Sequence, residues 1–278
     1  MPLARTADLV AAAYRAGSGV LACNVIMLEH AEAIVTGAEH VGRPVILQLS
    51  ENAVKFHHDR LHPIAAAASA VAAAAEVDVA VHLDHVEDER LLHACAGTGA
   101  SSVMFDASAL DYAANIAATK SAAQWAHREG LFLEAELGEV GGKDGAHAPG
   151  VRTDPGEAAE FVAATGVDAL AVAVGSSHAM ADRSASLDFE LIRRLRAAVP
   201  VPLVLHGSSG VADSELRKAV EAGITKINVG TLLNVRFTAA VRAHLAADPN
   251  VNDPRRYLAP AREAIAEVVA ALITTIDG

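Results

Sequence analysis

The sequence is short of cysteine, of basic residues and of long apolar runs, and each shortage excludes a class of protein. Its two cysteines, Cys23 and Cys95, cannot build a disulfide framework, so we expect a reducing, cytoplasmic setting. There are 22 Lys and Arg against 34 Asp and Glu, a formal charge of −12, which disfavours nucleic acid as a partner. The best apolar run, Ile64 to Ala75, falls short of the roughly 20 residues that span a bilayer, and the first residues lack a secretory-signal pattern.

Aliphatic residues are plentiful, and they fall into eight short β-branched runs separated by alanine-rich amphipathic stretches. Runs that are apolar almost throughout are typical of a parallel sheet buried on both faces. The alternation predicts an α/β fold, a (β/α)8 TIM barrel formed by residues 1–278 as a single domain, with a doubly wound open sheet as the alternative. The expected strands are Val20–Val25, Pro44–Leu49, Val79–Leu83, Ser102–Phe105, Phe132–Leu137, Ala169–Val174, Pro202–Leu205 and Ile224–Val229. The expected helices are Glu29–Glu39, Leu61–Ala75, Tyr112–Arg128, Pro155–Ala164, Phe189–Ala198 and Ser214–Ala222.

One stretch breaks the alternation, because residues 138–153 hold five glycines, one proline and no periodicity. A loop of this length inside a compact domain is typical of an active-site lid. We therefore expect a mobile active-site loop at about residues 138–153.

Histidine follows three of the expected strands, at His85, His178 and His206. In a (β/α)8 barrel the carboxyl ends of all strands meet at one mouth, where the catalytic groups lie. Three neutral imidazoles with an open fourth position are a ligand set for catalytic zinc. Any one of these histidines could instead be a buried core residue that binds no metal. We expect this of His82, which lies in the middle of its strand and should form a hydrogen bond inside the barrel.

Small polar residues follow the last two expected strands, as Gly207-Ser208-Ser209-Gly210 and Gly230-Thr231. Barrels commonly bind phosphate in these two loops, where backbone N–H groups and hydroxyls approach the oxygens without any net positive charge. The alternative for either loop alone is an ordinary tight turn.

A larger set of motifs runs over nearly the whole chain, and it is highly specific. It includes Cys23-Asn24-Val25, His82-Leu83-Asp84-His85, Ser102-Val103-Met104-Phe105-Asp106, Glu134-Ala135-Glu136-Leu137-Gly138, Ser176-Ser177-His178, His206-Gly207, Lys226-Ile227-Asn228-Val229 and Asp253-Pro254-Arg255. With these motifs the sequence resembles the class II, metal-dependent ketose-bisphosphate aldolases, which include fructose- and tagatose-1,6-bisphosphate aldolases.

The resemblance implies a metal centre with an acid/base beside it. His85, His178 and His206 match the family's catalytic zinc ligands. Asp106 and Glu136 match residues that hold a second or displaced zinc or orient the first ligands. Asp84 matches the acid/base that takes the proton of the C4 hydroxyl in cleavage and returns it in condensation.

The resemblance also implies two phosphate sites. The dihydroxyacetone-phosphate site matches the two loops and the last strand, with Asn228 also contacting the enediolate oxygen and Asn24 lying with the substrate-binding residues. Its residues are Gly207, Ser208, Ser209, Asn228, Val229, Gly230 and Thr231. Ser50 and Arg255 match contacts to the other phosphate, with Arg255 reaching in from a neighbouring subunit, so a homodimer or homotetramer is expected. Family members also use a monovalent cation, Na⁺ or K⁺, near the phosphate.

The sequence departs from the family pattern in three places. The loop after Gly141-Gly142 lacks the usual glutamate, so Asp144 is the expected catalytic base for the C3 proton, with His147 second. Ser208 replaces a glycine, and Gly230 stands where aspartate, asparagine or alanine is common. These changes leave the reaction type intact and put the aldehyde half of the substrate in doubt.

The leading hypothesis is a zinc-dependent aldolase that cleaves a ketose 1,6-bisphosphate to dihydroxyacetone phosphate and glyceraldehyde 3-phosphate. The same chemistry on another phosphorylated ketose or a deoxy-keto sugar acid is an alternative. A further alternative is Schiff-base chemistry through Lys226, which lies two residues before Asn228 and so points to the same, inward face of the strand. Another alternative is a non-catalytic subunit that supports another aldolase chain.

Overall fold

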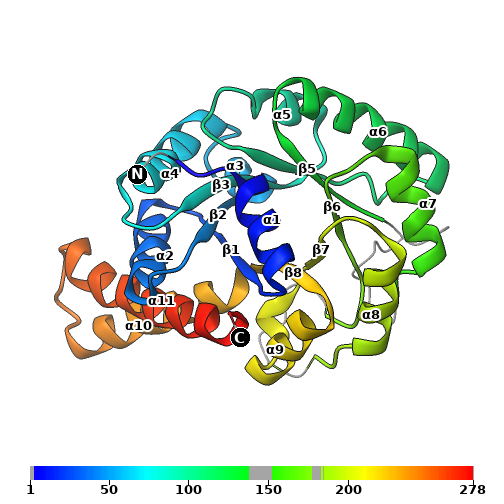
Figure 1. The fold of residues 1–278 in the computed structure, drawn as a ribbon. Helices are drawn as coiled ribbons and strands as arrows, with labels where there is room; N and C mark the ends of the chain where they lie inside the picture. Colours follow the sequence, from blue (N-terminus) through cyan, green and yellow to red (C-terminus); the bar gives the residue numbers. More distant parts are fainter. Residues whose placement is uncertain (1–2, 138–151, 177–182, 184, 278) are drawn as a thin grey trace.

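Eight parallel strands close into a barrel in the computed structural model, with helices around its outside (Figure 1). The structure describes residues 3–137, 152–176, 183 and 185–277. Each strand pairs with the next in chain order and β8 returns to β1, so the (β/α)8 barrel is confirmed and the open sheet is excluded. The strands are β1 Val20–Asn24, β2 Val45–Ser50, β3 Val79–Val86, β4 Ser102–Phe105, β5 Phe132–Glu136, β6 Ala169–Ala171, β7 Leu203–Leu205 and β8 Ile224–Val229.

The structure contains all six expected helices and adds others to them. The helices are α1 Thr6–Ala16, α2 Leu28–Val41, α3 Glu51–Phe56, α4 Leu61–Ala74, α5 Glu89–Ala94, α6 Tyr112–Arg128, α7 Pro155–Thr165, α8 Phe189–Ala198, the 3₁₀ turn η1 Ser208–Gly210, α9 Asp213–Ala222, α10 Thr231–Ala247 and α11 Pro254–Ile276. The added ones are α1, α3, α5, η1, α10 and α11. Local chemistry sets their ends: the Asp154 carboxylate accepts from two backbone N–H groups at the start of α7, and Gly166 ends it in the left-handed conformation.

Two strand limits were wrong by three residues, and the others differ by one residue at most. β3 continues three residues past Leu83, whereas β6 stops at Ala171 instead of Val174. The β6 ladder is short because β7 has only three residues, although the Val172 N–H still donates to the Val204 carbonyl. The extension of β3 matters for function, since it carries Asp84 and His85.

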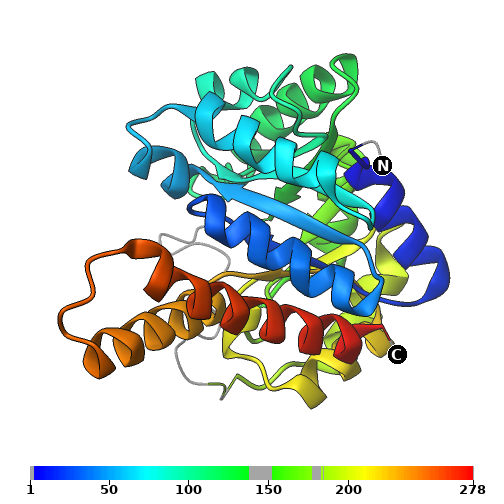
Figure 2. The ribbon, with the colours of Figure 1, turned by 90° about the vertical axis from the view of Figure 1, so that its left-hand side faces the viewer.

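The amino end of the barrel is closed and its carboxyl end is open. Helix α1 lies across the opening at the amino end (Figure 1), where Leu9 and Val10 pack against the inward residues Val20, Ala22 and Ile46. Turned by 90°, the molecule shows α1 at one end and the tip of the α10–α11 hairpin projecting at the other (Figure 2). The polar residues at the carboxyl ends of the strands can therefore be reached from one mouth only.

Helix α11 packs closely along α2 on the outside of the barrel. A Cβ added at Gly37 of α2 would lie 2.5 Å from the Ala266 carbonyl oxygen, so only glycine permits this approach. Within the residues described, every helix is too short or too polar to serve as a membrane span.

Candidate metal and active site at the carboxyl ends of the strands

A cavity of about 370 Å³ opens at the carboxyl ends of the strands. Ten of the residues that the sequence assigned to the site line it: Asn24, Ser50, Asp84, His85, His206, Gly207, Ser209, Asn228, Gly230 and Thr231. Gln48, Glu51, Asn52, Lys55 and Glu87 complete the lining, most of them from the β2–α3 corner. The barrel thus brings together strand-end residues that are far apart in the sequence.

A β-bulge in β3 allows two consecutive residues, Asp84 and His85, to reach this cavity together. Consecutive side chains of a regular strand point to opposite faces. The register with β4 shifts between Leu83 and Val86, where two residues of β3 face one of β4. His85 has a φ of 49°, in the left-handed region that residues with a Cβ rarely adopt. The bulge therefore turns the His85 ring toward the site instead of the outer helices.

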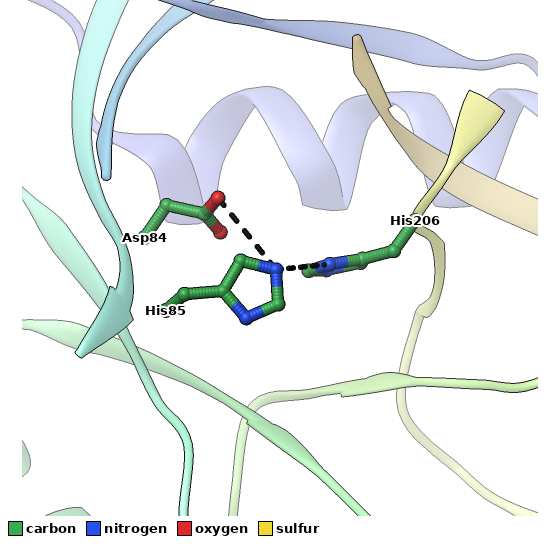
Figure 3. Close-up of side chains that lie close together, drawn as sticks. All are labelled: Asp84, His85 and His206. Atoms are coloured by element: carbon green, nitrogen blue, oxygen red, sulfur yellow. Dashed lines mark hydrogen bonds and ion pairs between the residues drawn. The ribbon is translucent and has the colours of Figure 1, made fainter. Parts of the chain in front are cut away.

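The rings of His85 and His206 meet at the centre of the cavity, beside Asp84 (Figure 3). His85 Nε2 lies 2.9 Å from His206 Nδ1, with the two rings nearly perpendicular. The far nitrogen of each ring faces a carboxylate: His85 Nδ1 is 3.1 Å from Asp106 Oδ2, and His206 Nε2 is 2.9 Å from Glu134 Oε1. Each carboxylate can only accept, so each far nitrogen carries a hydrogen. The near nitrogens are within hydrogen-bond distance, so His85 Nε2 donates a hydrogen to His206 Nδ1, and a bound metal ion would replace this hydrogen.

The charges around this pair favour a cation. Burial alone would lower the pKa of His85, but the carboxylates of Asp84, Asp106 and Glu136 raise it to about 10. Burial lowers the pKa of His206, which lies deeper in the barrel, and the neighbouring His85 lowers it further. Burial would raise the pKa of Asp106, but its hydrogen bonds with His85 and Ser108 lower it to about 2. The site therefore holds positive charge between ionised carboxylates.

These donors fit a zinc ion. Two nitrogens about 2.0–2.1 Å from a tetrahedral zinc lie roughly 3.3 Å apart. The 2.9 Å between His85 Nε2 and His206 Nδ1 is close to this separation. Carboxylates on the far ring nitrogens are the usual way that proteins orient zinc-binding histidines. Asp84, His85 and His206 offer ligand atoms within 4.8 Å of one another, and so do His85, Asp106 and Glu136. His178, the third expected ligand, lies outside the described residues.

Asp84 is held as a buried carboxylate. Gln48 Nε2 donates to its Oδ2 at 2.9 Å, and Asn228 Nδ2 lies 3.5 Å from its Oδ1. Burial would raise the pKa of Asp84, but His85, the His82 ring and other nearby positive groups hold it well below its usual range. His82 serves the core as expected, because its Nδ1 bonds to Ser102 Oγ at 2.7 Å inside the barrel.

Below His85 and His206 lies a buried ion pair between Lys226 and Glu134. Lys226 Nζ donates to Glu134 Oε2 at 2.8 Å, and both side chains are fully buried. Burial would raise the pKa of Glu134, but Lys226 and the hydrogen bond from His206 lower it to about 2. Sequence reasoning assigned no role to Glu134 or to Gln48. The only signal in the sequence was the spacing of two residues between Glu134 and Glu136 and between Lys226 and Asn228. In a strand this spacing places both side chains on the same face, but it does not show which residues they contact.

The two small-residue loops are tied together on one side of the cavity. The Ser209 hydroxyl accepts from the Leu232 N–H at 3.1 Å, so η1 is joined to the first turn of α10. Gly207 adopts the left-handed conformation, with a φ of 66°. Gly230 lies against Asn24, where an added Cβ would approach the Asn24 Nδ2 to 2.9 Å.

Three of the expected substrate-binding residues do not line the cavity of their own chain. The Ser208 hydroxyl donates to the Leu205 carbonyl, and Val229 is buried in β8 beside β1. Arg255 is highly exposed near the tip of the α10–α11 hairpin and pairs with Asp253. The expected bases Asp144 and His147 lie outside the described residues, as does the expected loop except for Arg152 and Thr153.

Comparisons with known proteins agree on one family. A family model described as fructose-bisphosphate aldolase class-II matches residues 4–277. The YdjI aldolase of Escherichia coli K12 is 33% identical, with 99% of this chain and 98% of that chain covered and a TM-score of 0.85. A Coccidioides immitis protein assigned as a fructose-1,6-bisphosphate aldolase is 30% identical over 98% and 96% of the chains, with a TM-score of 0.83. A fructose-bisphosphate aldolase of Campylobacter jejuni, 22% identical over 99% and 95%, shares the fold with a TM-score of 0.82.

Proposed function

The chain belongs to the class II fructose-bisphosphate aldolase family, and from this membership we propose that it is a zinc-dependent aldolase acting on a ketose 1,6-bisphosphate. The products of cleavage are dihydroxyacetone phosphate and glyceraldehyde 3-phosphate, and the reaction is reversible. The observation that carries the proposal is the 2.9 Å approach of His85 Nε2 and His206 Nδ1, each backed by a carboxylate and both beside Asp84.

His85, His206 and His178 would hold the metal, with Asp106 and Glu136 orienting His85 or holding a second ion. Bound zinc supplies Lewis-acid polarisation of the substrate ketone. The chain supplies the proton transfers: Asp84, kept ionised by its neighbours, takes the proton of the C4 hydroxyl as the C3–C4 bond breaks. Asp144 would then give a proton to C3 of the dihydroxyacetone half in cleavage and take it back in condensation, with His147 as the second candidate.

The phosphate of the dihydroxyacetone half would lie on the two tied loops, where Gly207, Ser209 and Thr231 present backbone and hydroxyl groups. Asn228 lines the cavity, and its side chain would contact the enediolate oxygen. A monovalent cation, Na⁺ or K⁺, would balance the phosphate charge. This arrangement needs no net positive charge, which suits a protein of formal charge −12.

The second phosphate would lie at the other end of the cavity, near Ser50 and Asn52. We propose that Arg255 reaches this end from a second copy of the chain, in a homodimer or homotetramer. Its high exposure on a projecting hairpin supports this. The two free, buried cysteines support a reducing, cytoplasmic compartment.

Purified protein assayed with dihydroxyacetone phosphate and a panel of aldehydes tests the proposal. We expect condensation with glyceraldehyde 3-phosphate, loss of activity with EDTA and recovery with zinc. Preference for another aldehyde would move the substrate to a different phosphorylated ketose or a deoxy-keto sugar acid. Absence of turnover with every aldehyde, despite bound zinc, would favour the non-catalytic subunit.

A further inference from the structure

The ammonium group of Lys226 is at the centre of the polar network under the active site. Its side chain is fully buried on β8. Nζ lies 2.8 Å from Glu134 Oε2, 2.9 Å from Asn228 Oδ1 and 3.2 Å from Gln48 Oε1. An ammonium has three hydrogens to donate, and these three acceptors use all of them.

Each of these three side chains also contacts His206 or Asp84 through its other polar atom. The second oxygen of Glu134 accepts from His206 Nε2. The amide nitrogen of Gln48 donates to Asp84 Oδ2 at 2.9 Å. The amide nitrogen of Asn228 lies 3.5 Å from Asp84 Oδ1, the acceptor available to it, because the nearer His206 Nε2, at 3.0 Å, itself donates to Glu134. Lys226 is thus connected to His206 and to Asp84 through a single intervening side chain in each case.

An ammonium selects one of the two orientations of an amide. Because Lys226 can only donate, Gln48 and Asn228 must turn their carbonyl oxygens toward it, and their NH₂ groups must then face Asp84. If either amide rotated by half a turn, a carbonyl oxygen would face the Asp84 carboxylate, which has no hydrogen to share. We propose that Lys226 is a positioning residue, whose ammonium fixes the Gln48 and Asn228 amides as donors toward Asp84 and neutralises Glu134 behind His206.

This role is incompatible with Schiff-base chemistry. A lysine nucleophile must be neutral and must reach the substrate carbonyl. The Lys226 nitrogen is occupied by three acceptors, one of them a carboxylate. The proposal rests on the proposed function only for its kinetic consequence, because the orientation of the amides can be measured without zinc or substrate.

The test compares Lys226→Met with Lys218→Met, an exposed lysine paired with Glu215. Exchange of the Gln48 and Asn228 side-chain amide hydrogens is measured by NMR in zinc-free protein, together with backbone amides of β5. We expect Lys226→Met to speed exchange of both side-chain amides at least about 10-fold with β5 unchanged, a local loosening and not global unfolding. The kcat/KM for cleavage should fall by about 100-fold, the upper range for residues that support metal ligands. Lys218→Met should match the wild type in both measurements.

Because Lys226→Met leaves Glu134 buried without its partner, the double variant Lys226→Met with Glu134→Gln is measured as well. It buries no unpaired charge, and we expect the same loss of amide protection. Protected Gln48 and Asn228 amides in either folded variant would overturn the proposal, as would a substrate adduct trapped on Lys226 by borohydride. A wild type with protected amides but without aldolase activity would refute the proposed function and leave this positioning role standing.

Discussion

Replacing Gly230 by alanine should weaken substrate binding through Asn24. The added Cβ would lie 2.9 Å from Asn24 Nδ2 and 3.1 Å from its Cγ, too close for real contacts. The Asn24 side chain is the more flexible partner, so it should swing away and lose its 2.8 Å hydrogen bond from Gln48 Nε2. Such a bond contributes about 0.5–1.5 kcal/mol, which corresponds to roughly a 2- to 13-fold change in an equilibrium constant.

Steady-state kinetics of cleavage measure this effect. We expect KM for the ketose bisphosphate to rise within that range while kcat changes little, because the three atoms nearest the methyl group all belong to Asn24. Asn24→Ala should raise KM by a similar factor, and the double variant should be no worse than either single variant. An unchanged KM for Gly230→Ala, or effects that multiply in the double variant, would refute the reasoning.

Three other predictions concern the base, a metal-orienting carboxylate and a buried histidine. Asp144→Ala should abolish exchange of the C3 proton of dihydroxyacetone phosphate with solvent, and retained exchange would move the base elsewhere, with His147 next. Asp106→Asn should weaken zinc binding by about 10- to 100-fold in chelator competition, because His85 loses a charged acceptor, and an unchanged affinity would contradict the assigned geometry. Burial lowers the pKa of His30, so the folded state resists its protonation and stability should fall as the pH drops below about 6.5. Urea unfolding at pH 7 and pH 5 should show a smaller loss for His30→Gln than for the wild type, and equal losses would count against this role.

Most of the fold could be predicted from the sequence, because strand burial and helix ends depend on local residue patterns. Apolar runs buried on both faces and cap residues such as Asp154 and Gly166 are visible without a structure. The limits of β3 and β6 were not, because a strand ends where its neighbour stops pairing. The length of β6 depends on β7, more than thirty residues away.

The site was predictable as a set of strand-end residues but not as a network. Strict alternation would separate Asp84 from His85, and only the bulge places both in the cavity. Glu134 and Lys226 showed inward parity, yet their pairing under His206 arises from contacts across the barrel interior. Parity predicts which way a side chain points, whereas its partner depends on the closed barrel.

Zinc-dependent turnover tests the central claim most directly. The purified protein should contain near-stoichiometric zinc and cleave a ketose 1,6-bisphosphate to dihydroxyacetone phosphate. EDTA should remove both the metal and the activity, and added zinc should restore both. Activity that survives complete removal of the metal would contradict the account of His85 and His206 as metal ligands.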